Sequence, residues 1–313
     1  MLLLIAKRLG MGAVTLVLVS LITFGLLHLT PGDPAQVAAG PDADEAAVDA
    51  ARQRLGLDRS LVVQYASWAG NLLRGDLGTS FVQNRAVLDM ILERLPVTLS
   101  LVGLSLVVSL LIALPLGVLA ATRRDTILDR GAVLWASTGI ALPDFFLGLL
   151  LVLAFAIHLG WFPATGFVPL GENPGLWLTH LVLPAVTLGT TVAAELTRHI
   201  RASLSDVLEL DYVRTARAKG IGGSRVVLKH AMRNAALPVM TVFGIQLARL
   251  LGGTVIVEQI FNLPGIGQLI VASIFQRDLP VILGMGVFIA SMVLVVNLLV
   301  DISYGWLNPK VRT

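Results

Sequence analysis

The residues with the strongest chemical character form a basic, water-compatible segment between two apolar stretches. It reads Asp211-Tyr212-Val213-Arg214-Thr215-Ala216-Arg217-Ala218-Lys219-Gly220 and continues through Arg233-Asn234 to Leu237-Pro238. Small apolar side chains stand beside cationic ones, and no apolar run in this segment is long enough to cross a membrane. A projection of this composition suits insertion into a groove on another protein, so the segment predicts docking and not covalent catalysis.

The glycines of this segment predict a tight turn between two helices. Gly220 and the Gly222-Gly223 pair tolerate positive φ, which a tight turn requires. Ser224 is expected to cap a second helix over Arg225–Ala236 by accepting a hydrogen bond from a first-turn N–H. Pro238 is then expected to restart the chain at the membrane, because a missing N–H costs little at a helix start.

Signatures of catalysis are absent from the chain. There is no G-x-x-x-x-G-K-[ST] phosphate loop, so the chain is not expected to bind ATP in the usual way. H-E-x-x-H and G-x-S-x-G, the commonest signatures of intramembrane metalloproteases and hydrolases, are missing too. With no cysteine, disulfides and thiolate metal sites are excluded. We therefore predict no catalytic residue, no metal site and no cofactor bound by this chain.

The composition places the chain in a bilayer. Of its 313 residues, 56% are hydrophobic and 14% charged, against about 45–50% and 25% in soluble domains. The mean hydropathy is +0.83. Aromatic residues make up only 6%, and they are not interleaved with the basic residues as a nucleic-acid surface requires. The composition thus argues for a membrane protein and against nucleic-acid binding.

Six apolar stretches are long enough to cross the hydrocarbon core, which takes about 20 residues. The first is too long for a secretory signal and lacks an A-x-A-like cleavage site, so we expect a retained helix. The predicted fold is all-α, a polytopic membrane protein with six transmembrane helices. The spans are Arg8–Thr30, Pro96–Ala121, Ala132–Leu159, His180–Ile200, Pro238–Val257 and Val281–Tyr304.

The lysine and arginine residues predict the orientation of these spans. With the N-terminus inside, most of the 23 basic residues fall on the cytoplasmic side. Six basic residues on the other side lie in one long acidic loop, and long loops translocate largely regardless of charge. Both termini are therefore expected in the cytoplasm.

The same pattern divides the chain into parts. Residues 1–30 form the N-terminal segment and first span, and residues 31–95 form an extracytoplasmic helical cap. In the cap, Leu61, Tyr65, Trp68 and Leu72 share one helical face, which favours a cap lying on the outer membrane surface. Packing against the spans and contact with an external partner remain equally open roles. Residues 96–304 form a five-helix core with a coupling loop at about 201–237, and 305–313 form a cytoplasmic tail.

The basic segment resembles the coupling loop of permeases of ATP-binding-cassette (ABC) importers. In that family the loop carries an acidic residue, two alanines and a glycine, followed later by Leu-Pro. Here the acidic start is absent, and Gly220 and Pro238 lie farther apart than usual. Both departures resemble the dipeptide and oligopeptide branch, whose Asp-Tyr-x-Arg-Thr-Ala-x-Ala-Lys-Gly and Arg-Asn-x-x-x-Pro elements match Asp211–Gly220 and Arg233–Pro238.

Further elements of the same branch occur in order along essentially the whole chain. The sequence near Ala39-Gly40-Pro41 is similar to that of glutathione permeases of this branch. The other elements are Pro31-Gly32-Asp33-Pro34, Leu55-Gly56-Leu57-Asp58, Gly75-Asp76-Leu77-Gly78, Gly252-Gly253, Val257-Glu258-Gln259-Ile260-Phe261-Asn262, Pro264-Gly265-Ile266-Gly267, Val300-Asp301 and Asn308-Pro309-Lys310-Val311-Arg312.

The resemblance implies a multi-pass subunit in the cytoplasmic (inner) membrane of a prokaryote that imports dipeptides or short peptides by alternating access. The implied partners are membrane lipid, a homologous second permease, two cytoplasmic ATPase subunits carrying ATP and Mg, and an extracytoplasmic peptide-binding protein. Glutathione or a nickel chelate is the alternative substrate within the family. An ATP-independent secondary transporter or channel is the alternative of another class, although no inverted repeat supports it.

The implied ATPase-coupling residues are Tyr212, Arg214, Thr215, Ala216, Arg217, Ala218, Lys219, Gly220, Arg233, Asn234 and Pro238.

Polar residues inside the spans suggest a substrate pathway. Gln246 and Arg249 are three positions apart and share a helix face. An arginine in a span is costly unless it faces water or a partner, so Arg249 is interpreted as a cationic patch for a peptide carboxylate, with snorkelling or pairing as the alternative. Gly252 and Gly253 either allow close helix packing, the favoured role, or act in a gate. Candidate outer-loop or gate residues are Glu258, Phe261, Asn262, Pro264 and Gly265.

Two further groups of polar residues are interpreted as structural. Glu195 and His199 lie four apart near the inner end of the fourth span, and they are expected to form a local pair at the membrane edge. Asp144 follows Pro143, where the proline opens the backbone hydrogen-bond ladder and polar groups can be satisfied.

Overall fold

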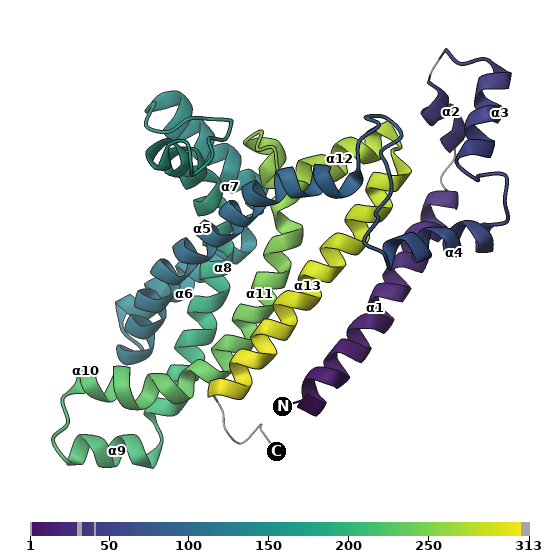
Figure 1. Cartoon of the computed structure of the whole chain (residues 1–313). Helices are drawn as coiled ribbons and strands as arrows, with labels where there is room; N and C mark the ends of the chain where they lie inside the picture. Colours follow the sequence, from purple (N-terminus) through teal and green to yellow (C-terminus); the bar gives the residue numbers. More distant parts are fainter. Residues whose placement is uncertain (1, 30–32, 41, 308–313) are drawn as a thin grey trace. The chain divides into compact units, whose positions relative to one another are not determined.

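The structure is a computed structural model that describes residues 2–29, 33–40 and 42–307. Within them the regular structure is helical, apart from one isolated antiparallel bridge between Thr79 and Ala86. The predicted elements at Pro31-Gly32, Pro41 and Asn308–Arg312 lie outside the described residues. The helices are α1 (Leu2–Leu29), α2 (Pro34–Ala39), α3 (Glu45–Arg54), α4 (Leu61–Leu72), α5 (Val87–Thr122), α6 (Ile127–Ala141), α7 (Asp144–Leu151), a π-helical segment (Val152–His158), α8 (Pro174–Leu208), α9 (Asp211–Ala218), α10 (Gly223–Arg225), a second π-helical segment (Val226–Ala231), α11 (Met232–Ile260), α12 (Ile266–Gln276) and α13 (Leu279–Leu307) (Figure 1).

The all-α, multi-pass prediction is confirmed by helix length and composition. Four helical stretches are long and apolar enough to cross a membrane, namely Val87–Thr122, Pro174–Leu208, Gly223–Ile260 and Leu279–Val300. The pair Ile127–Ala141 and Asp144–His158 adds a fifth if it counts as one broken span. In α1 the apolar stretch Gly10–Leu26 is shorter. The count of six spans and the cytoplasmic termini stay predictions.

The predicted span Ala132–Leu159 is interrupted by a break in its middle. The chain bends by 101° between α6 and α7. Leu142 is extended, with φ −80° and ψ 123°, because the residue before a proline is sterically pushed away from the helical region. Pro143 then leads into α7, and Asp144 in the first turn of α7 accepts a hydrogen bond from the Thr191 hydroxyl of α8. The polar group that the proline was expected to accommodate thus has a partner within the chain.

The prediction that a new helix begins at Pro238 is wrong. The chain is helical from Gly223 through the second π-helical segment to Ile260, and Pro238 lies inside α11. A proline inside a helix removes one backbone hydrogen bond, which helices in membranes tolerate better than soluble ones. The predicted helix cap at Ser224 is wrong as well, because the helix begins earlier than expected. Gly222 occupies the N-cap position, so Ser224 is already within the first turn and makes no capping bond.

The described residues divide into two compact units. The first contains residues 97–263 and 296–307, and the second contains residues 2–96 and 264–295. The predicted boundary between cap and core falls near residue 95, close to the division at 96/97. Residues 264–295, placed in the core by the sequence, group instead with the N-terminal part of the chain.

Helix α8 is the centre of the first unit. It contacts α6, α7 and α11. Its buried residues recur along most of its length, from Leu181 near one end to Leu204 near the other. Burial at these positions places α8 in the middle of the unit. It also means that α8 connects the middle of the unit to the loop that follows Leu208.

Small residues allow the helices of this unit to approach closely, as is usual in membrane proteins. A Cβ atom added to Gly189 of α8 would lie 2.8 Å from the Ser105 carbonyl oxygen of α5. One added to Gly139 of α6 would lie 2.9 Å from the Ala194 Cβ. Glycine at these positions is therefore required by interhelical distance and not by backbone conformation.

The second unit has its own apolar core. Asp278, 1% exposed, accepts hydrogen bonds from the Ser80 hydroxyl at 2.5 Å and the Phe81 N–H at 3.0 Å. These bonds attach the loop before α5 to the start of α13. A Cβ on Gly284 would lie 2.8 Å from Val87, so the two helices approach closely beside this loop. The buried core residues are Leu77, Val87, Met90, Ile91, Ile266, Leu269, Val281 and Met285.

We predict that Gly189→Ala destabilises the protein by about 1–3 kcal/mol, because the added methyl group meets a backbone carbonyl that cannot move aside. Gly103→Ala in α5 is the matched control, since nothing lies within 4 Å of its added Cβ and alanine favours helix. Thermal unfolding of the detergent-solubilised variants is the measurement. Equal melting temperatures for the two variants would contradict the close approach of α5 and α8.

Candidate functional site

The predicted coupling loop folds as a short helix followed by a glycine turn. Helix α9 ends in hydrogen bonds from the Gly220 N–H to the Arg217 carbonyl at 2.9 Å and from the Ile221 N–H to the Ala216 carbonyl at 3.3 Å. Gly220 has φ +76°, so the prediction of a positive-φ glycine is confirmed there. Gly222 has φ −57° and does not need to be glycine for this reason.

One face of α9 packs inside the loop. Val213 is fully buried, Ala216 is 8% exposed, and both pack against the buried Val226 of the returning helical segment. Leu208 and Ile221 complete this small cluster. The loop therefore has an apolar core of its own, and Ala216 belongs to it.

The other face of α9 is exposed and mostly basic. Tyr212 is 39% exposed. Of the two alanines in the motif, Ala218 faces outward, so it and not Ala216 is available to a partner in this structure. The remaining exposed candidates are Arg214, Thr215, Arg217, Lys219 and Gly220. Arg225 and Lys229 on the returning segment are exposed as well and extend the positive charge.

Hydrogen bonds connect α9 to the returning helix. The Asn234 side-chain amide donates to the Tyr212 hydroxyl at 2.8 Å, and that hydroxyl donates to the His230 carbonyl at 3.3 Å. The structure thus brings together Tyr212 and Asn234 from the two separate sequence elements. Arg233 is exposed beside them, whereas Pro238 lies one helical turn beyond Asn234 in α11.

The base of the loop is fixed to the ends of three helices. The Ser203 hydroxyl of α8 donates to the Ala235 carbonyl of α11 at 2.9 Å. Around this bond, Leu204, Ala231 and Ala235 form a buried cluster with Ala121 of α5. Movement of the loop would therefore displace the ends of α5, α8 and α11 together.

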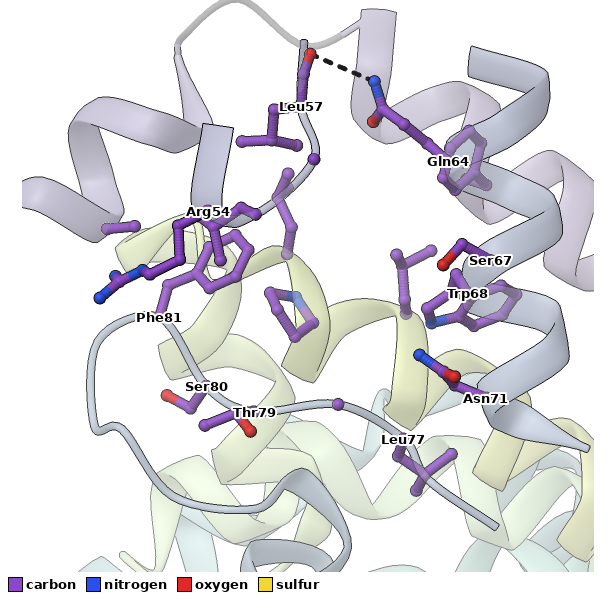
Figure 2. Close-up of a pocket in the computed structure, with 18 of the residues that line it drawn as sticks. Arg54, Leu57, Gln64, Ser67, Trp68, Asn71, Leu77, Thr79, Ser80 and Phe81 are labelled. Atoms are coloured by element: carbon purple, nitrogen blue, oxygen red, sulfur yellow. Dashed lines mark hydrogen bonds between the residues drawn. The ribbon is translucent and has the colours of Figure 1, made fainter. Parts of the chain in front are cut away.

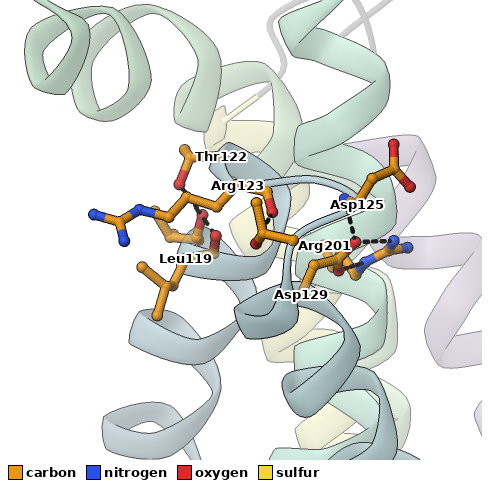
Figure 3. A network of polar contacts seen from close by, with 8 residues as sticks. Leu119, Thr122, Arg123, Asp125, Asp129 and Arg201 are labelled. Atoms are coloured by element: carbon orange, nitrogen blue, oxygen red, sulfur yellow. Dashed lines mark hydrogen bonds and ion pairs between the residues drawn. The ribbon is translucent and has the colours of Figure 1, made fainter.

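A salt bridge that the sequence analysis missed supports this base. Arg201 of α8 binds Asp129 of α6 through two hydrogen bonds, one of them 2.8 Å between Nη2 and Oδ2 (Figure 3). The Asp125 N–H also donates to Asp129 at 3.0 Å. Asp129 is only 3% exposed, and a buried carboxylate requires such partners. Nothing in the sequence pairs two residues so far apart.

A second salt bridge lies beside the first. Arg124, in the turn between α5 and α6, binds Glu209 at the end of α8 at 2.6 Å. Both partners are more than half exposed, so this pair contributes little energy on its own. Together the two pairs hold the α5–α6 turn against the helix from which the coupling loop emerges.

The candidate pathway residues do not form one shared surface. Gln246 is 5% exposed, whereas the Arg249 side chain is 70% exposed. Arg249 lies 3.9 Å from Glu195, which is 25% exposed. This contact is the pairing alternative, and it gives Glu195 a partner other than the predicted His199. No atom lies within 4 Å of a Cβ added to Gly252, so the favoured packing role of that glycine finds no support within this chain.

The candidate gate residues are largely buried. Glu258 is fully buried and accepts a hydrogen bond from the Thr98 hydroxyl at 2.7 Å. Phe261 is 1% exposed, and its carbonyl accepts from the Gly166 N–H at 3.1 Å. Asn262 is exposed, with φ +47°. In the second unit, Pro264 is exposed and Gly265 is buried. These contacts hold the end of α11 in place whether or not it acts in a gate.

The fold has a counterpart among solved protein structures. It resembles a chain in inward-facing structures of the MetNI methionine ABC transporter, with a TM-score of 0.57 and 18% sequence identity. The match covers 71% of this chain and 97% of that one. At this identity the likeness concerns the fold alone.

The chain belongs to the family described as binding-protein-dependent transport system inner membrane component, which matches residues 113–313. The N-terminal component of the same system matches residues 1–102. The oligopeptide transport system permease protein AppB of Bacillus subtilis is 41% identical over 311 residues, 98% of each chain. The glutathione transport system permease protein GsiC of Escherichia coli is 43% identical over 298 residues, 95% of each chain. This protein is a multi-pass permease component of the inner membrane.

We predict that Ala216→Leu opens the coupling loop, because the small cluster around Val213 and Val226 has no room for three more carbon atoms. Limited trypsin digestion should then cleave the loop several-fold faster at Arg214, Arg217 or Lys219. Ala218→Leu, which adds the same atoms to the exposed face, should digest like the unmodified protein. Equal digestion rates for both variants would show that Ala216 does not hold the loop together.

Proposed function

We propose that this chain is the permease subunit of an ABC importer that moves dipeptides or other short peptides across the cytoplasmic membrane. The observation that carries the proposal is identity of 41–43% over nearly full length to permeases of oligopeptide and glutathione transport systems. The exposed, basic face of α9 supports this proposal, because a separate ATPase subunit would need a rigid projection of the permease to bind.

The proposed complex contains a homologous second permease, two cytoplasmic ATPase subunits and an extracytoplasmic peptide-binding protein. ATP and Mg would be bound by the ATPase subunits. The coupling contacts would involve Ala218, Gly220 and the basic residues Arg214, Arg217 and Lys219, which are exposed on α9 and its turn. Their charge favours an acidic groove on the ATPase.

The attachments of the loop suggest how ATPase motion would reach the membrane. The loop has its own core, is bonded to α11 through Tyr212 and Asn234, and is braced at its base by Arg201 and Asp129. A displacement of such a stiff element is transmitted to α8 and α11 and is not absorbed within the loop. ATP binding would draw the loops together and open the pathway outward, and hydrolysis would reset it.

The substrate class has alternatives within the family. Glutathione is one alternative, supported by the similarity to GsiC, and a nickel chelate is the other. A binding screen on the cognate extracytoplasmic protein, with di- to pentapeptides, glutathione and nickel chelates, tests the peptide proposal directly. Tight binding of peptides supports it, and binding of a nickel chelate alone overturns it.

An ATP-independent transporter is the alternative of a different class. Family membership argues against it, because binding-protein-dependent systems work with other components. Copurification of an ATPase with this chain would support the importer. Ion-driven uptake by the isolated chain in vesicles would overturn it.

We predict that Ala218→Trp uncouples the ATPase from transport. The exposed position should accept the side chain without loss of folding, while the indole blocks entry of α9 into a groove. Peptide uptake by the reconstituted complex should fall at least tenfold, with ATP hydrolysis retained. Gly220→Trp should have a similar effect but adds strain from its positive φ. Ala218→Ser is the control and should keep transport; unchanged uptake in Ala218→Trp would refute the docking role of this face.

We predict that Arg249→Ala lowers the uptake of anionic peptides and leaves neutral peptides unaffected, if Arg249 meets the substrate carboxylate in the pathway. Arg249→Lys keeps the charge near Glu195 and should retain most of the selectivity. Uptake of a matched pair of acidic and amidated peptides is the measurement. A selectivity unchanged by Arg249→Ala would assign Arg249 to pairing with Glu195 alone.

A further inference from the structure

A partly open cavity of about 580 Å³ lies within the second unit, lined mainly by α4, the residues after α3, the loop before α5 and the start of α13 (Figure 2). Its volume falls within the range of small-molecule sites, about 300–1,000 Å³. The loop that forms one wall is fixed by the buried Ser80–Asp278 hydrogen bond. Among the described residues that line this cavity none is acidic, and the charged ones are Arg54 and Arg59.

The cavity offers hydrogen-bond donors that the protein itself does not satisfy. The Nε1 atom of Trp68 is buried, and within the described part of the chain it has no hydrogen-bond partner. An indole N–H is only a donor, and a buried donor without an acceptor is costly. Arg54 and Arg59 form no salt bridge with any described residue. The lining thus favours an anionic ligand with acceptor oxygens.

Helix α4 is polar on the side that faces this cavity and apolar on the opposite side. Gln64, Ser67, Trp68 and Asn71 recur at helical spacing along the cavity wall (Figure 2). The opposite row contains Val62 at 77% exposure and Ala66, which is also exposed, and the chain leaves the helix at Leu73 with 89% exposure. Such an arrangement is unfavourable for a helix surrounded by water but suits one with lipid outside and a hydrated cavity inside.

The position of α4 along α1 supports a location of α4 beside lipid. The Ser20 and Tyr65 hydroxyls are hydrogen-bonded at 2.8 Å, and the Phe24 and Tyr65 rings meet edge to face at 5.4 Å. Both α1 residues lie inside the apolar stretch Gly10–Leu26, roughly 8–14 Å along the helix axis before Leu29. Helix α4 therefore crosses α1 at a level where α1 itself is apolar (Figure 1).

Helix α1, which α4 contacts through Tyr65, also exposes apolar side chains. Exposed side chains of α1 include Val17, Leu21 and Ile22, each between 46% and 59% exposed. No acidic residue occurs between Ser60 and Gly75, whereas Arg59 and Arg74 flank the helix, an arrangement typical of helices at an anionic lipid surface. The acyl chains of a lipid could lie along this surface while its headgroup occupies the cavity.

From these observations we propose that the cavity binds the headgroup of an anionic phospholipid of the outer leaflet, with α4 embedded at the membrane interface. The Trp68 N–H donates to the headgroup, Arg54 and Arg59 supply the positive charge of the cavity lining, and the apolar row of α4 contacts the acyl chains. This assignment gives the cationic cavity and the exposed apolar row a common explanation. A peptide carboxylate would match the cavity alone and leave the apolar row unexplained.

Lipid retention by the purified full-length chain tests the binding site. Native mass spectrometry in detergent would compare phosphatidylglycerol, phosphatidylcholine and inorganic phosphate as separate probes. We expect preferential retention of phosphatidylglycerol, and about fivefold weaker retention for each cavity arginine replaced in Arg54→Gln and Arg59→Gln. Trp68→Phe keeps the ring, removes the N–H and should also weaken retention. Arg277→Gln, which is exposed and lies outside the cavity, is the control and should not.

Each alternative result overturns the proposal. Equal retention of phosphatidylcholine, or retention unchanged in Trp68→Phe and both arginine variants, would exclude a headgroup site. Phosphate binding as tight as that of phosphatidylglycerol would assign the cavity to the free anion. Displacement of the lipid by a short acidic peptide at equal concentration would assign it to a peptide.

The membrane position of α4 has an independent test, because the chain contains no cysteine and single cysteines can be labelled uniquely. In bilayers, a spin label at Val62→Cys should be accessible to oxygen, which concentrates in lipid. A label at Ser67→Cys should be accessible to a water-soluble nickel complex. Access of the nickel complex to the label at Val62→Cys would show that α4 faces water and would overturn the proposal.

Discussion

The Arg201–Asp129 salt bridge is the constraint on which the arrangement of the coupling loop depends. Asp129 is almost completely buried, and its two carboxylate oxygens accept from the guanidinium and from a backbone N–H. Removing one partner of a buried pair leaves an uncompensated charge, at a cost of about 3–5 kcal/mol, and less here because the Arg201 side chain is 30% exposed. The bridge therefore fixes the register between α6 and α8 just before the chain enters the loop.

The loop itself could be predicted from sequence only in part. Its position, its basic face and the positive φ of Gly220 follow from residue types, because only glycine adopts that conformation without strain. The burial of Ala216 and the exposure of Ala218 could not be predicted, since two alanines on one short helix look alike in sequence. Their difference arises from Val226, which returns ten residues later and covers one of them.

Proline was the least reliable guide to the fold. Pro143 and Pro238 both suggested local interruptions; the chain does bend sharply at the first, but it continues as helix through the second. The same residue type gives opposite results because packing decides whether a helix recovers from a lost hydrogen bond. Burial of Gln246 and Glu258 was equally inaccessible to sequence reasoning, because it depends on helices remote in the chain.

Helices α9 and α4 bury opposite sides, and this difference agrees with the proposal that α9 lies in water and α4 at the lipid interface. On α9, apolar residues turn inward and charges outward, as expected for an element in water. On α4 the polar residues turn toward a cavity and the apolar ones outward. A uniform hydropathy scale assigns both helices to surface segments. What distinguishes them is the direction of the polar side chains. They face outward on α9, which we propose to meet a protein partner, and inward on α4, which we propose to meet the bilayer.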